Sequence, residues 1–299
     1  MFGGAIKRVT SDQKGDCILK VVLFCGGMGL RLRDHAEALP KPIVSIGHRP
    51  LIWHVMKYYA HYGQKDFVLC LGYKSEVIKE YFLRYNEAIS NDFVMSEGGK
   101  SLQLLGADIQ DWTITFAETG LNANIGQRLK AVERYLHGEE LFLANYSDGL
   151  TDYPLPSMLE HFKQSGKVAA FLCVQPPQSF HVVSLADEHR VTSIQHISRS
   201  GLYINGGYFI FKKAIFDYMR DGEELVEEPF RRLAAEGLLG GYRHDGFWLP
   251  MDTFKDRQVL EDMFSRGSAP WEVWKTASSS GLAADAVSIA WDGADRRPL

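Results

Sequence analysis

Cysteine, long apolar runs and excess positive charge are all scarce in this chain of 299 residues. The four cysteines, Cys17, Cys25, Cys70 and Cys173, lie far apart and form no CxxC pair, which argues against a zinc knuckle or a dense disulfide framework. No apolar run reaches the ~18 residues that suggest a membrane span. Because the first residues also lack the apolar stretch of a signal peptide, we expect a cytoplasmic protein with no membrane partner.

The charge balance argues against a nucleic-acid partner. The chain has 33 Lys and Arg against 37 Asp and Glu, a net charge of −4, whereas proteins that bind by neutralising phosphates usually carry a clear basic excess. Hydrophobic residues are abundant, at 45%, and prolines number only 11. This composition is typical of a folded globular protein with a sizeable core.

Short apolar runs and amphipathic segments alternate along the chain from Lys20 onward. The run KVVLFC (20–25) is typical of a strand covered on both faces, and residues 51–63 carry apolar side chains at helical spacing. Between 167 and 212, four strand-like runs follow one another with little helix between them. This order predicts an α/β fold: a mixed, mostly parallel sheet flanked by helices, with a small antiparallel portion.

Composition also sets the expected boundaries of the folded part. Residues 1–19 are polar and glycine-containing, which predicts a loose leader. Residues 20–275 are expected to form one domain, because no Pro/Ser-rich linker or internal repeat divides them. From 276 to 299 the chain is rich in Ala, Ser and Gly, which predicts a mobile tail.

A glycine-rich loop follows the first predicted strand, where backbone N–H groups can approach phosphate oxygens. The loop is not a Walker A motif, because no GK[ST] follows it, and it lacks the third glycine of the dinucleotide-binding fingerprint. Two cations are placed near the loop: Arg31 lies within it, and Lys41 follows between two prolines. Together they suit a triphosphate, although a surface turn with two solvated cations is the alternative. The loop residues are Gly26, Gly27, Met28 and Gly29.

Two aspartates are candidate ligands for Mg²⁺. Asp148 ends an apolar strand in NYSDG, and ligands of open α/β sheets bind outside the carboxyl ends of strands. Asp252, in PMDT, is the possible second carboxylate. Mg²⁺ prefers such oxygen ligands together with phosphate oxygens. The alternatives are a plain Asp-Gly turn at Asp148 and a helix N-cap at Asp252.

The run YINGGYFIF places two glycines inside a strand pattern. Gly206 and Gly207 are costly there and indicate either a bulge or the close approach of a ligand. Asn205 beside them can hydrogen-bond sugar hydroxyls. A bulge with no ligand is the alternative.

Taken in order, these motifs resemble the sugar-1-phosphate nucleotidyltransferases. The resemblance runs from about 20 to 275 and rests on GGMGLRLR…PKP, NYSDG, YINGGYFIF and HDGFWLPMDTFKDRQVLE. The ending GFW…MDT…LE with APW points to the cytidylyl branch. The resemblance implies the Rossmann-like nucleotide-diphospho-sugar transferase fold, Mg²⁺ as cofactor and a homo-oligomer. It also implies transfer of CMP from CTP to glucose-1-phosphate or a related sugar-1-phosphate, with release of pyrophosphate.

The same resemblance assigns roles to the candidate residues. Arg31 would bind the leaving pyrophosphate and Lys41 the α-phosphate region, while Asp148 and Asp252 would hold Mg²⁺. Gly26, Gly27, Met28 and Gly29 would cradle the nucleotide, and Asn205, Gly206 and Gly207 would line the sugar pocket.

Departures from the family pattern concentrate on the sugar side. The family usually carries Glu-Lys-Pro where this chain reads QHIS (195–198), so Ile197 stands where a lysine would pair with the sugar phosphate. Arg199 is the candidate substitute. In addition, Leu30 stands where the family usually has threonine, and His181 stands where the family tends to have glycine.

Three alternatives therefore stay open. The enzyme could use another base or another sugar-1-phosphate, or the chain could be a non-catalytic homologue that binds nucleotide sugars. A glycosyltransferase of related fold is disfavoured, because no DxD motif stands at Asp148.

Overall fold

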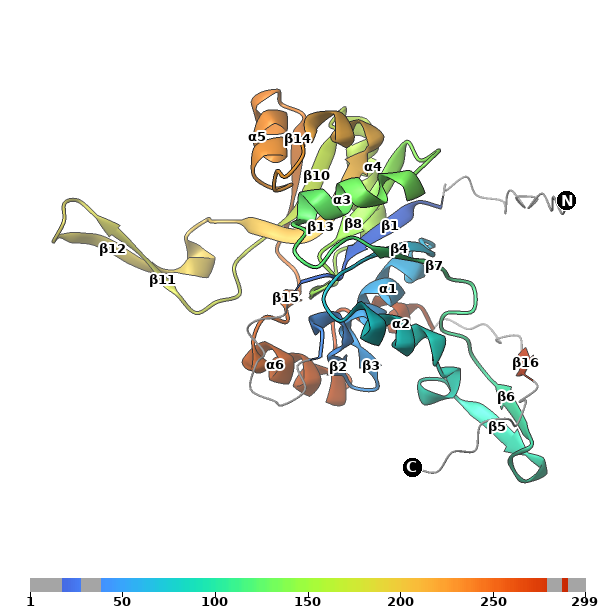
Figure 1. Cartoon of the computed structure of the whole chain (residues 1–299). Coiled ribbons are helices and arrows are strands. Elements are labelled where there is room, and N and C mark those ends of the chain that lie inside the picture. The colour runs from blue at the N-terminus through green and yellow to red at the C-terminus, as the bar shows by residue number, and fades with distance from the viewer. Residues whose placement is uncertain (1–17, 28–38, 279–286, 290–299) are drawn as a thin grey trace, which may run out of the picture.

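The computed structural model describes residues 18–27, 39–278 and 287–289. Its central element is a seven-stranded sheet, shown in Figure 1. The sheet strands are β1 (Lys20–Phe24), β4 (Asp66–Leu71), β7 (Thr113–Glu118), β8 (Leu141–Asn145), β10 (Ala169–Val174), β13 (Ile204–Lys212) and β14 (Leu239–His244). Their order is β14-β10-β13-β8-β1-β4-β7. Strand β13 alone runs antiparallel to its neighbours β8 and β10, so the predicted mixed, mostly parallel sheet is confirmed.

Helices cover both faces of this sheet. The α-helices are α1 (Leu51–His61), α2 (Ser75–Leu83), α3 (Ile125–Val132), α4 (Leu155–Ser165), α5 (Glu228–Ala235), α6 (Phe254–Ser265) and α7 (Val273–Ser278). The 3-10 helices are η1 (Lys41–Ile43), η2 (Glu87–Ile89), η3 (Glu97–Gly99), η4 (Glu133–Tyr135), η5 (Ile197–Arg199) and η6 (Lys213–Tyr218).

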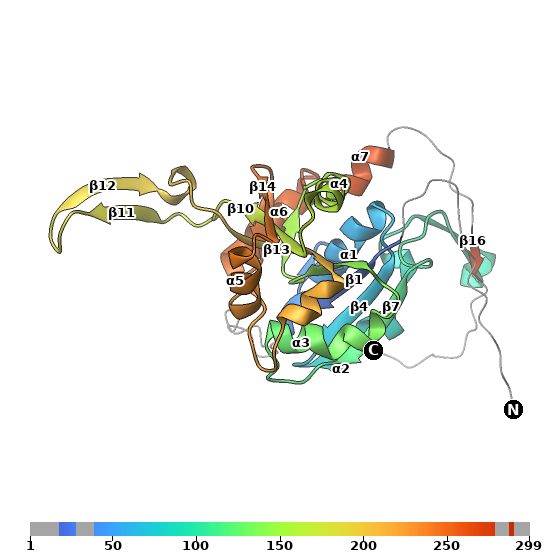
Figure 2. The same ribbon diagram turned by 90° about the horizontal axis from the view of Figure 1, so that it is seen from above.

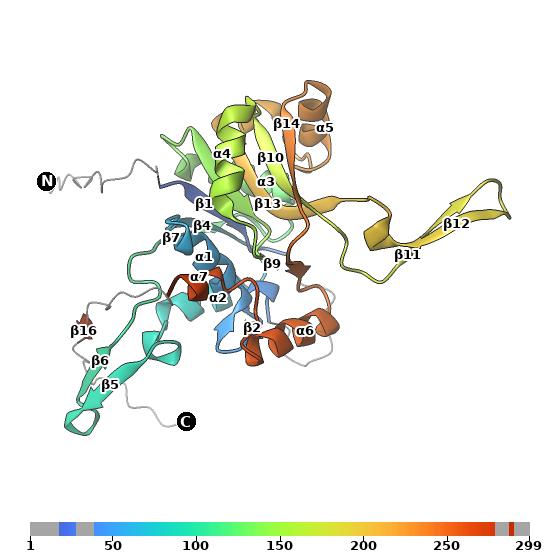
Figure 3. The same ribbon diagram turned by 180° about the vertical axis from the view of Figure 1, so that it is seen from behind.

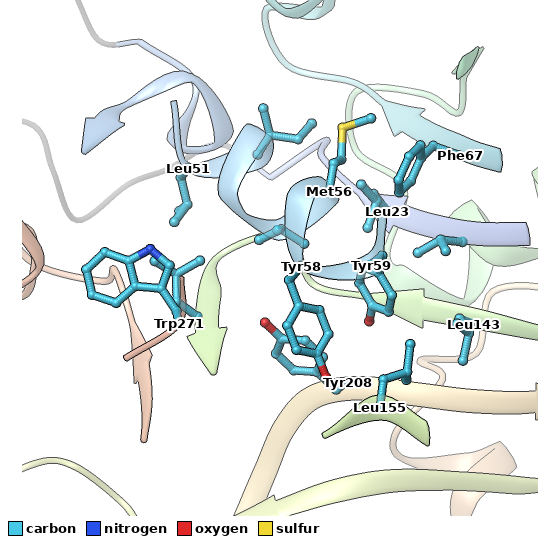
Figure 4. Close-up of a cluster of buried hydrophobic side chains, with 14 of the residues drawn as sticks. Leu23, Leu51, Met56, Tyr58, Tyr59, Phe67, Leu143, Leu155, Tyr208 and Trp271 are labelled. Carbon is cyan, nitrogen blue, oxygen red and sulfur yellow. The ribbon is translucent and has the colours of Figure 1, made fainter. Parts of the chain in front are cut away.

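The alternation of side chains along β1 divides the apolar core into two layers. Val21 and Leu23 point into one layer, which includes residues of α1, α2, α4 and α6. Val22 and Phe24 point into the other, which includes residues of α3, α5 and η6. Figure 4 shows the first layer, where Tyr58, Tyr59 and Trp271 are almost fully buried. These three aromatic side chains therefore serve the core, not an exposed interface.

Four small sheets surround the central one. They are β2 (Ser45–Ile46) with β3 (Arg49–Pro50), β9 (Gly149–Thr151) with β15 (Trp248–Pro250), β11 (His181–Leu185) with β12 (Val191–His196), and β5 (Phe93–Ser96) with β6 (Ser101–Leu104) and β16 (Val287–Ile289). The pair β11–β12 extends far from the rest of the molecule in Figures 1, 2 and 3. Within the described residues, no helix has the length and apolar character needed to cross a membrane.

Candidate active site

Four parallel strands end at the same edge of the central sheet. The residues that follow β1, β4, β7 and β8 include Gly26, Gly72, Gly120 and Asp148. In open α/β sheets this edge is where ligands bind. The glycine loop and the first predicted metal ligand therefore lie on the same side of the fold.

Lys41 and the two predicted metal ligands meet at this edge. The Nζ atom of Lys41 donates to Asp148 Oδ2 at 2.9 Å and to Asp252 Oδ1 at 2.6 Å. The side chain of Lys41 is 15% exposed, whereas those of Asp148 and Asp252 are 33% and 37% exposed. One cation thus bridges two half-buried carboxylates.

Segments far apart in the sequence create this arrangement. Lys41 opens the short helix η1, where Pro40 and Pro42 restrict the backbone on either side. Strand β15 pairs with β9, and the N–H of Met251 donates to Asp148 O at 2.8 Å. This ladder brings Asp252, two residues after β15, beside Asp148.

The helix cap that follows excludes one alternative for Asp252. Thr253 is the N-cap of α6: its side chain accepts from the N–H of Asp256, whose carboxylate accepts from the N–H of Thr253. The carboxylate of Asp252 binds Lys41 instead of capping the helix. The interpretation of Asp252 as a simple N-cap is therefore wrong.

Ser147 fixes the backbone directly before Asp148. Its φ is +61°, a left-handed conformation that is uncommon outside glycine and costs of order 1 kcal/mol or more. Two buried hydrogen bonds hold it there: its N–H donates to Asn145 Oδ1 at 2.6 Å, and its Oγ donates to Phe24 O at 2.7 Å. The second bond ties the Asp148 turn to the end of β1, which leads into the glycine loop.

The charges of the site shift one another's pKa values. Burial alone would lower the pKa of the Lys41 ammonium, but Asp148 and Asp252 outweigh it, and the pKa lies above its ordinary value. Burial raises the pKa of the Asp148 carboxyl, and the charge of Asp252 adds to the rise, while Lys41 opposes it. Lys41 therefore stays a cation at neutral pH, and Asp148 takes up a proton at a higher pH than an exposed aspartate does.

The two carboxylates suit a magnesium ion whose remaining ligands come from the substrate. No group of three or more His, Cys, Asp or Glu side chains in the described part of the chain could hold a metal. Mg²⁺, however, is usually bound through one or two carboxylates together with substrate phosphates and water. Asp148 and Asp252, whose oxygens converge on one cation, match that requirement.

Arg128 connects the ends of three strands, β1, β4 and β7, through hydrogen bonds to their backbone. Its buried guanidinium donates to Gly26 O at 3.1 Å, to Leu71 O at 3.2 Å and to Gly120 O at 3.0 Å. A Cβ atom on Gly26 would lie 2.1 Å from Nη1 of Arg128, so any larger residue there would displace the guanidinium from these hydrogen bonds. Arg128 holds the start of the predicted phosphate loop, a role that no sequence motif indicates.

The rest of the predicted nucleotide loop is only partly described. Among the residues that the structure describes, none lies within 4 Å of a Cβ atom placed on Gly27. Met28, Gly29 and Arg31 lie outside the described residues, and their roles stay predictions.

The glycine pair of β13 forms a bulge. The pairing between β10 and β13 shifts register here, and Gly207 has a φ of +75°. A Cβ atom on Gly207 would lie 2.6 Å from the ring of Tyr146. The bulge also engages Asn205, whose Nδ2 donates to Tyr146 Oη at 3.1 Å and whose Oδ1 accepts from the N–H of Gly207 at 2.9 Å.

Trp248 closes the other side of this bulge. Its Nε1 donates to Gly206 O at 2.9 Å, and a Cβ atom on Gly206 would crowd the same indole nitrogen at 3.3 Å. Packing thus accounts for both glycines. The sugar-binding roles of Asn205, Gly206 and Gly207 stay predictions, as does that of Arg199, whose side chain is exposed in η5.

The sequence matches the nucleotidyl transferase family over residues 20–249. The chain therefore belongs to this family, in agreement with the position of the site at the strand ends. Solved structures support the same fold. The UTP-bound UGPase of Acinetobacter baumannii has a TM-score of 0.63 at 14% identity, covering 89% of this chain and all of that one. HddC of Yersinia pseudotuberculosis, complexed with GMP-PN, has a TM-score of 0.60 at 19% identity, with 82% and 99% covered.

Within the family, the chain is similar over most of its length to glucose-1-phosphate cytidylyltransferases. The enzyme of Salmonella typhi is 36% identical over 260 residues, which cover 86% of this chain and all of that protein. A probable glucose-1-phosphate cytidylyltransferase of Bacillus subtilis is 37% identical over 258 residues, with the same coverage. A mannose-1-phosphate guanyltransferase of Hypocrea jecorina is 26% identical over 247 residues, which cover 80% of this chain and 62% of that protein.

Proposed function

We propose that this protein transfers CMP from CTP to glucose-1-phosphate or a closely related sugar-1-phosphate. The observation that carries the proposal is the contact of Lys41 with both Asp148 and Asp252 at the carboxyl edge of the sheet. The similarity to glucose-1-phosphate cytidylyltransferases over 86% of the chain supports the choice of base and sugar.

In the proposed reaction, a phosphate oxygen of the sugar-1-phosphate attacks the α-phosphorus of CTP. A new phosphorus–oxygen bond forms, the bond to the bridging oxygen of the β-phosphate breaks, and pyrophosphate leaves with that electron pair. The products are CDP-sugar and pyrophosphate. Catalysis of this kind depends mainly on positioning the two substrates in line and neutralising their charge.

Lys41 supplies a fixed positive charge at the reacting phosphate. It neutralises the two carboxylates in the structure, and a metal ion bound by the same carboxylates would compete with it for their oxygens. Lys41 then exchanges its carboxylate partners for oxygens of the α-phosphate. The raised pKa keeps Lys41 protonated for that contact at neutral pH.

Asp148 and Asp252 are the proposed ligands of the metal. The family generally uses a divalent cation, and we propose Mg²⁺ on the chemistry of two carboxylates completed by phosphate oxygens. When bound, this ion polarises phosphate oxygens and offsets charge on the leaving pyrophosphate. Ser147 holds Asp148 in place, and Arg128 holds the Gly26 backbone that would face the phosphates.

The sugar substrate is less certain to be glucose-1-phosphate than the base is to be cytosine, because the family's lysine is absent. Residues 195–198 read QHIS, so Ile197 stands where the family pattern has a lysine that pairs with the sugar phosphate. Loss of one charge-assisted contact costs about 1.5–3 kcal/mol, which is enough to weaken binding of glucose-1-phosphate. A related sugar-1-phosphate with compensating contacts is therefore the alternative acceptor.

A panel assay tests the proposal. Pyrophosphate release is measured with Mg²⁺ for CTP, dTTP, UTP, GTP and ATP, each against several sugar-1-phosphates. We expect release with CTP and glucose-1-phosphate or a close relative of it. Release only with another base contradicts the cytidylyl assignment, and a protein that binds nucleotide without any release supports the non-catalytic alternative.

The location and assembly of the enzyme also remain proposals. CTP and a sugar-1-phosphate are the proposed small-molecule partners, and a cytoplasmic location is proposed on the similarity to glucose-1-phosphate cytidylyltransferases. A homo-oligomer is the proposed state.

A further inference from the structure

Two histidines lie opposite each other at the base of the ribbon that β11 and β12 form. The strand pairing joins His181 to His196, and their ring centroids are 5.4 Å apart with the rings at 85° to each other. His181 is exposed and His196 is half-buried. Because directly opposed residues of paired strands have their side chains on the same face, one ligand can contact both imidazoles.

The base of the ribbon belongs to the same edge of the central sheet as Asp148. The ribbon is inserted between β10 and β13, whose residues Val174 and Ile204 pair with each other. Further along β13, Tyr208 pairs with Asn145, the last residue of β8, which leads into Asp148. Figure 1 shows the ribbon leaving the body of the molecule next to β13. The two histidines are therefore connected to the edge that carries the candidate active site.

The backbone determines which nitrogen of His196 carries a proton. Its Nδ1 accepts from the N–H of Ser198 at 3.3 Å and lies 2.8 Å from Ser198 Oγ. A backbone N–H can only donate, so Nδ1 holds a lone pair and the proton of the neutral ring is on Nε2. The turn is also held in place, because the N–H of Ile197 donates to Phe180 O at 2.9 Å. His196 thus presents its Nε2–H as a hydrogen-bond donor.

In the part of the chain that the structure describes, no carboxylate competes for these imidazoles. Neither histidine forms an ion pair there, and no described residue is hydrogen-bonded to Nε2 of His196. The two strands read HVVSL and VTSIQH, so the histidines are their only ionisable side chains. The charged residue nearest to His196 along the chain is a cation, Arg199. The base of the ribbon therefore offers donors without a negative charge beside them in sequence.

This arrangement suits an anion better than a metal ion. A metal ion binds a lone pair of the imidazole, and the lone pair of His196 is already engaged by Ser198. To free Nε2 for a metal, the proton would have to move to Nδ1, which would break that hydrogen bond. A phosphate oxygen instead accepts from Nε2–H, and such a bond is strong because the acceptor carries a negative charge.

We propose that His181 and His196 bind the phosphate group of the acceptor sugar-1-phosphate. The Nε2–H of His196 donates to one phosphate oxygen, and the imidazole of His181, on the same face, supplies a second donor. This proposal rests on the proposed function and adds the residues that recognise the acceptor. It also explains how a chain with Ile197 in QHIS (195–198) binds the acceptor phosphate without a lysine at that position.

Steady-state kinetics of phenylalanine variants tests this role. His181→Phe with His196→Phe keeps two aromatic rings at the cross-strand pair but removes their N–H donors, and should raise the KM for the sugar-1-phosphate roughly tenfold or more without changing the KM for CTP. His181→Phe alone leaves the contact of His196 with Ser198 intact and should raise the same KM by a smaller factor. His189→Phe, an exposed position at the tip of the ribbon, is the matched control and should change neither constant.

An unchanged KM for the sugar-1-phosphate in the double variant overturns the proposal. An equal rise in the KM for CTP, or an equal effect of His189→Phe, overturns it as well, because the loss would then not be specific to the acceptor or to the base of the ribbon.

A titration without turnover separates this proposal from the proposed function. Proton NMR follows the imidazole signals of the whole chain as glucose-1-phosphate or inorganic phosphate is added, with a CTP analogue whose α–β bridge is a methylene group already present. The phenylalanine variants identify the signals of His181 and His196. We expect these two signals to shift with a saturable dependence on either probe, and the signal of His189 to stay in place.

The outcomes of the titration differ for the two proposals. No shift of either signal with both probes contradicts the phosphate site, even if the protein makes a nucleotide sugar. Shifts with Zn²⁺ alone and not with phosphate would show a metal site in its place. Saturable shifts in a protein that releases no pyrophosphate with any substrate pair leave the phosphate site standing and contradict the proposed function.

Discussion

The proposed nucleotide side and the proposed sugar side of this protein are built differently. On the nucleotide side, Lys41, Asp148 and Asp252 lie at strand ends, and buried hydrogen bonds from Ser147 and Arg128 fix the backbone around them. On the proposed sugar side, the projecting ribbon of β11 and β12, whose residues are mostly exposed, precedes the glycine bulge of β13. Phosphoryl chemistry requires groups held in a fixed geometry, whereas the choice of acceptor depends on side chains carried by loops and projections. The comparison therefore separates the residues proposed to set the rate from those proposed to select the sugar.

The largest effect is expected from Lys41. Lys41→Met removes the charge at the α-phosphate and should lower kcat roughly 10²–10³-fold, a loss comparable to that of one donor to a transition-state charge. Lys65→Met is the matched control, because Lys65 pairs with Asp111 away from the site. Steady-state rates of pyrophosphate release measure both variants, and an unchanged kcat in Lys41→Met would make the catalytic assignment wrong.

Asp252→Asn should act mainly through the metal. It keeps the shape of the side chain but removes one charge, so the Mg²⁺ concentration for half-maximal rate should rise roughly 10–100-fold. Asp111→Asn, at the surface pair with Lys65, serves as control. A rate that falls without any shift in the Mg²⁺ dependence contradicts the role of Asp252 as a metal ligand.

Ile197→Lys sharpens the comparison from the sugar side. Restoring the cation of the family pattern should lower the KM for glucose-1-phosphate roughly tenfold, with the KM for CTP unchanged. Leu83→Lys adds the same charge at an exposed position on α2 and should change neither constant. If Ile197→Lys leaves the KM of every sugar-1-phosphate unchanged, residues 195–199 do not contact the acceptor phosphate.

The smallest effect on activity is expected from replacing His54, which lies in the packed body of the fold. This histidine should instead affect how the stability of the protein depends on pH. Burial lowers the pKa of His54 to about 4, while Trp271 Nε1 donates to its Nδ1 at 3.3 Å. The unfolded chain protonates this histidine near its ordinary pKa of about 6.5, so between that pH and about 4 the unfolded state binds more protons. The free energy of unfolding should therefore fall by about 1 kcal/mol per pH unit across this window as the pH decreases.

Urea unfolding at several pH values between 7 and 4 measures this dependence. His54→Gln removes the titrating group, so its stability should vary less with pH in this window than that of the wild type. Equal slopes for the two proteins would show that His54 is not the group responsible.

Local patterns in the sequence were sufficient to predict most elements and the three residues that meet at the site. Apolar runs predicted the strands β1, β8, β10 and β13 of the central sheet, and the motifs singled out Lys41, Asp148 and Asp252. The pairing of β9 with β15, which joins the two aspartates, could not be predicted because it links segments about 100 residues apart by short strands with no periodic signal.

The burial of Arg128 and the projection of β11 and β12 were not predicted, for different reasons. Arg128 lies on the same face of α3 as Ile125 and Val132, and this spacing could have indicated burial, but arginine is usually exposed. Strands β11 and β12 were both predicted as strand-like runs. Their projection from the body was not, because a strand pattern does not indicate which surface packs against the strand.

The most direct test of the central claim is product formation by the wild type and Lys41→Met side by side. CTP, glucose-1-phosphate and Mg²⁺ are mixed with each protein, CDP-glucose is detected by mass spectrometry, and CTP binding is measured in parallel. We expect the wild type to form CDP-glucose and pyrophosphate in equal amounts, and Lys41→Met to bind CTP with little product. A wild type that binds CTP but forms no nucleotide sugar from any sugar-1-phosphate would contradict the assignment of this site to nucleotidyl transfer.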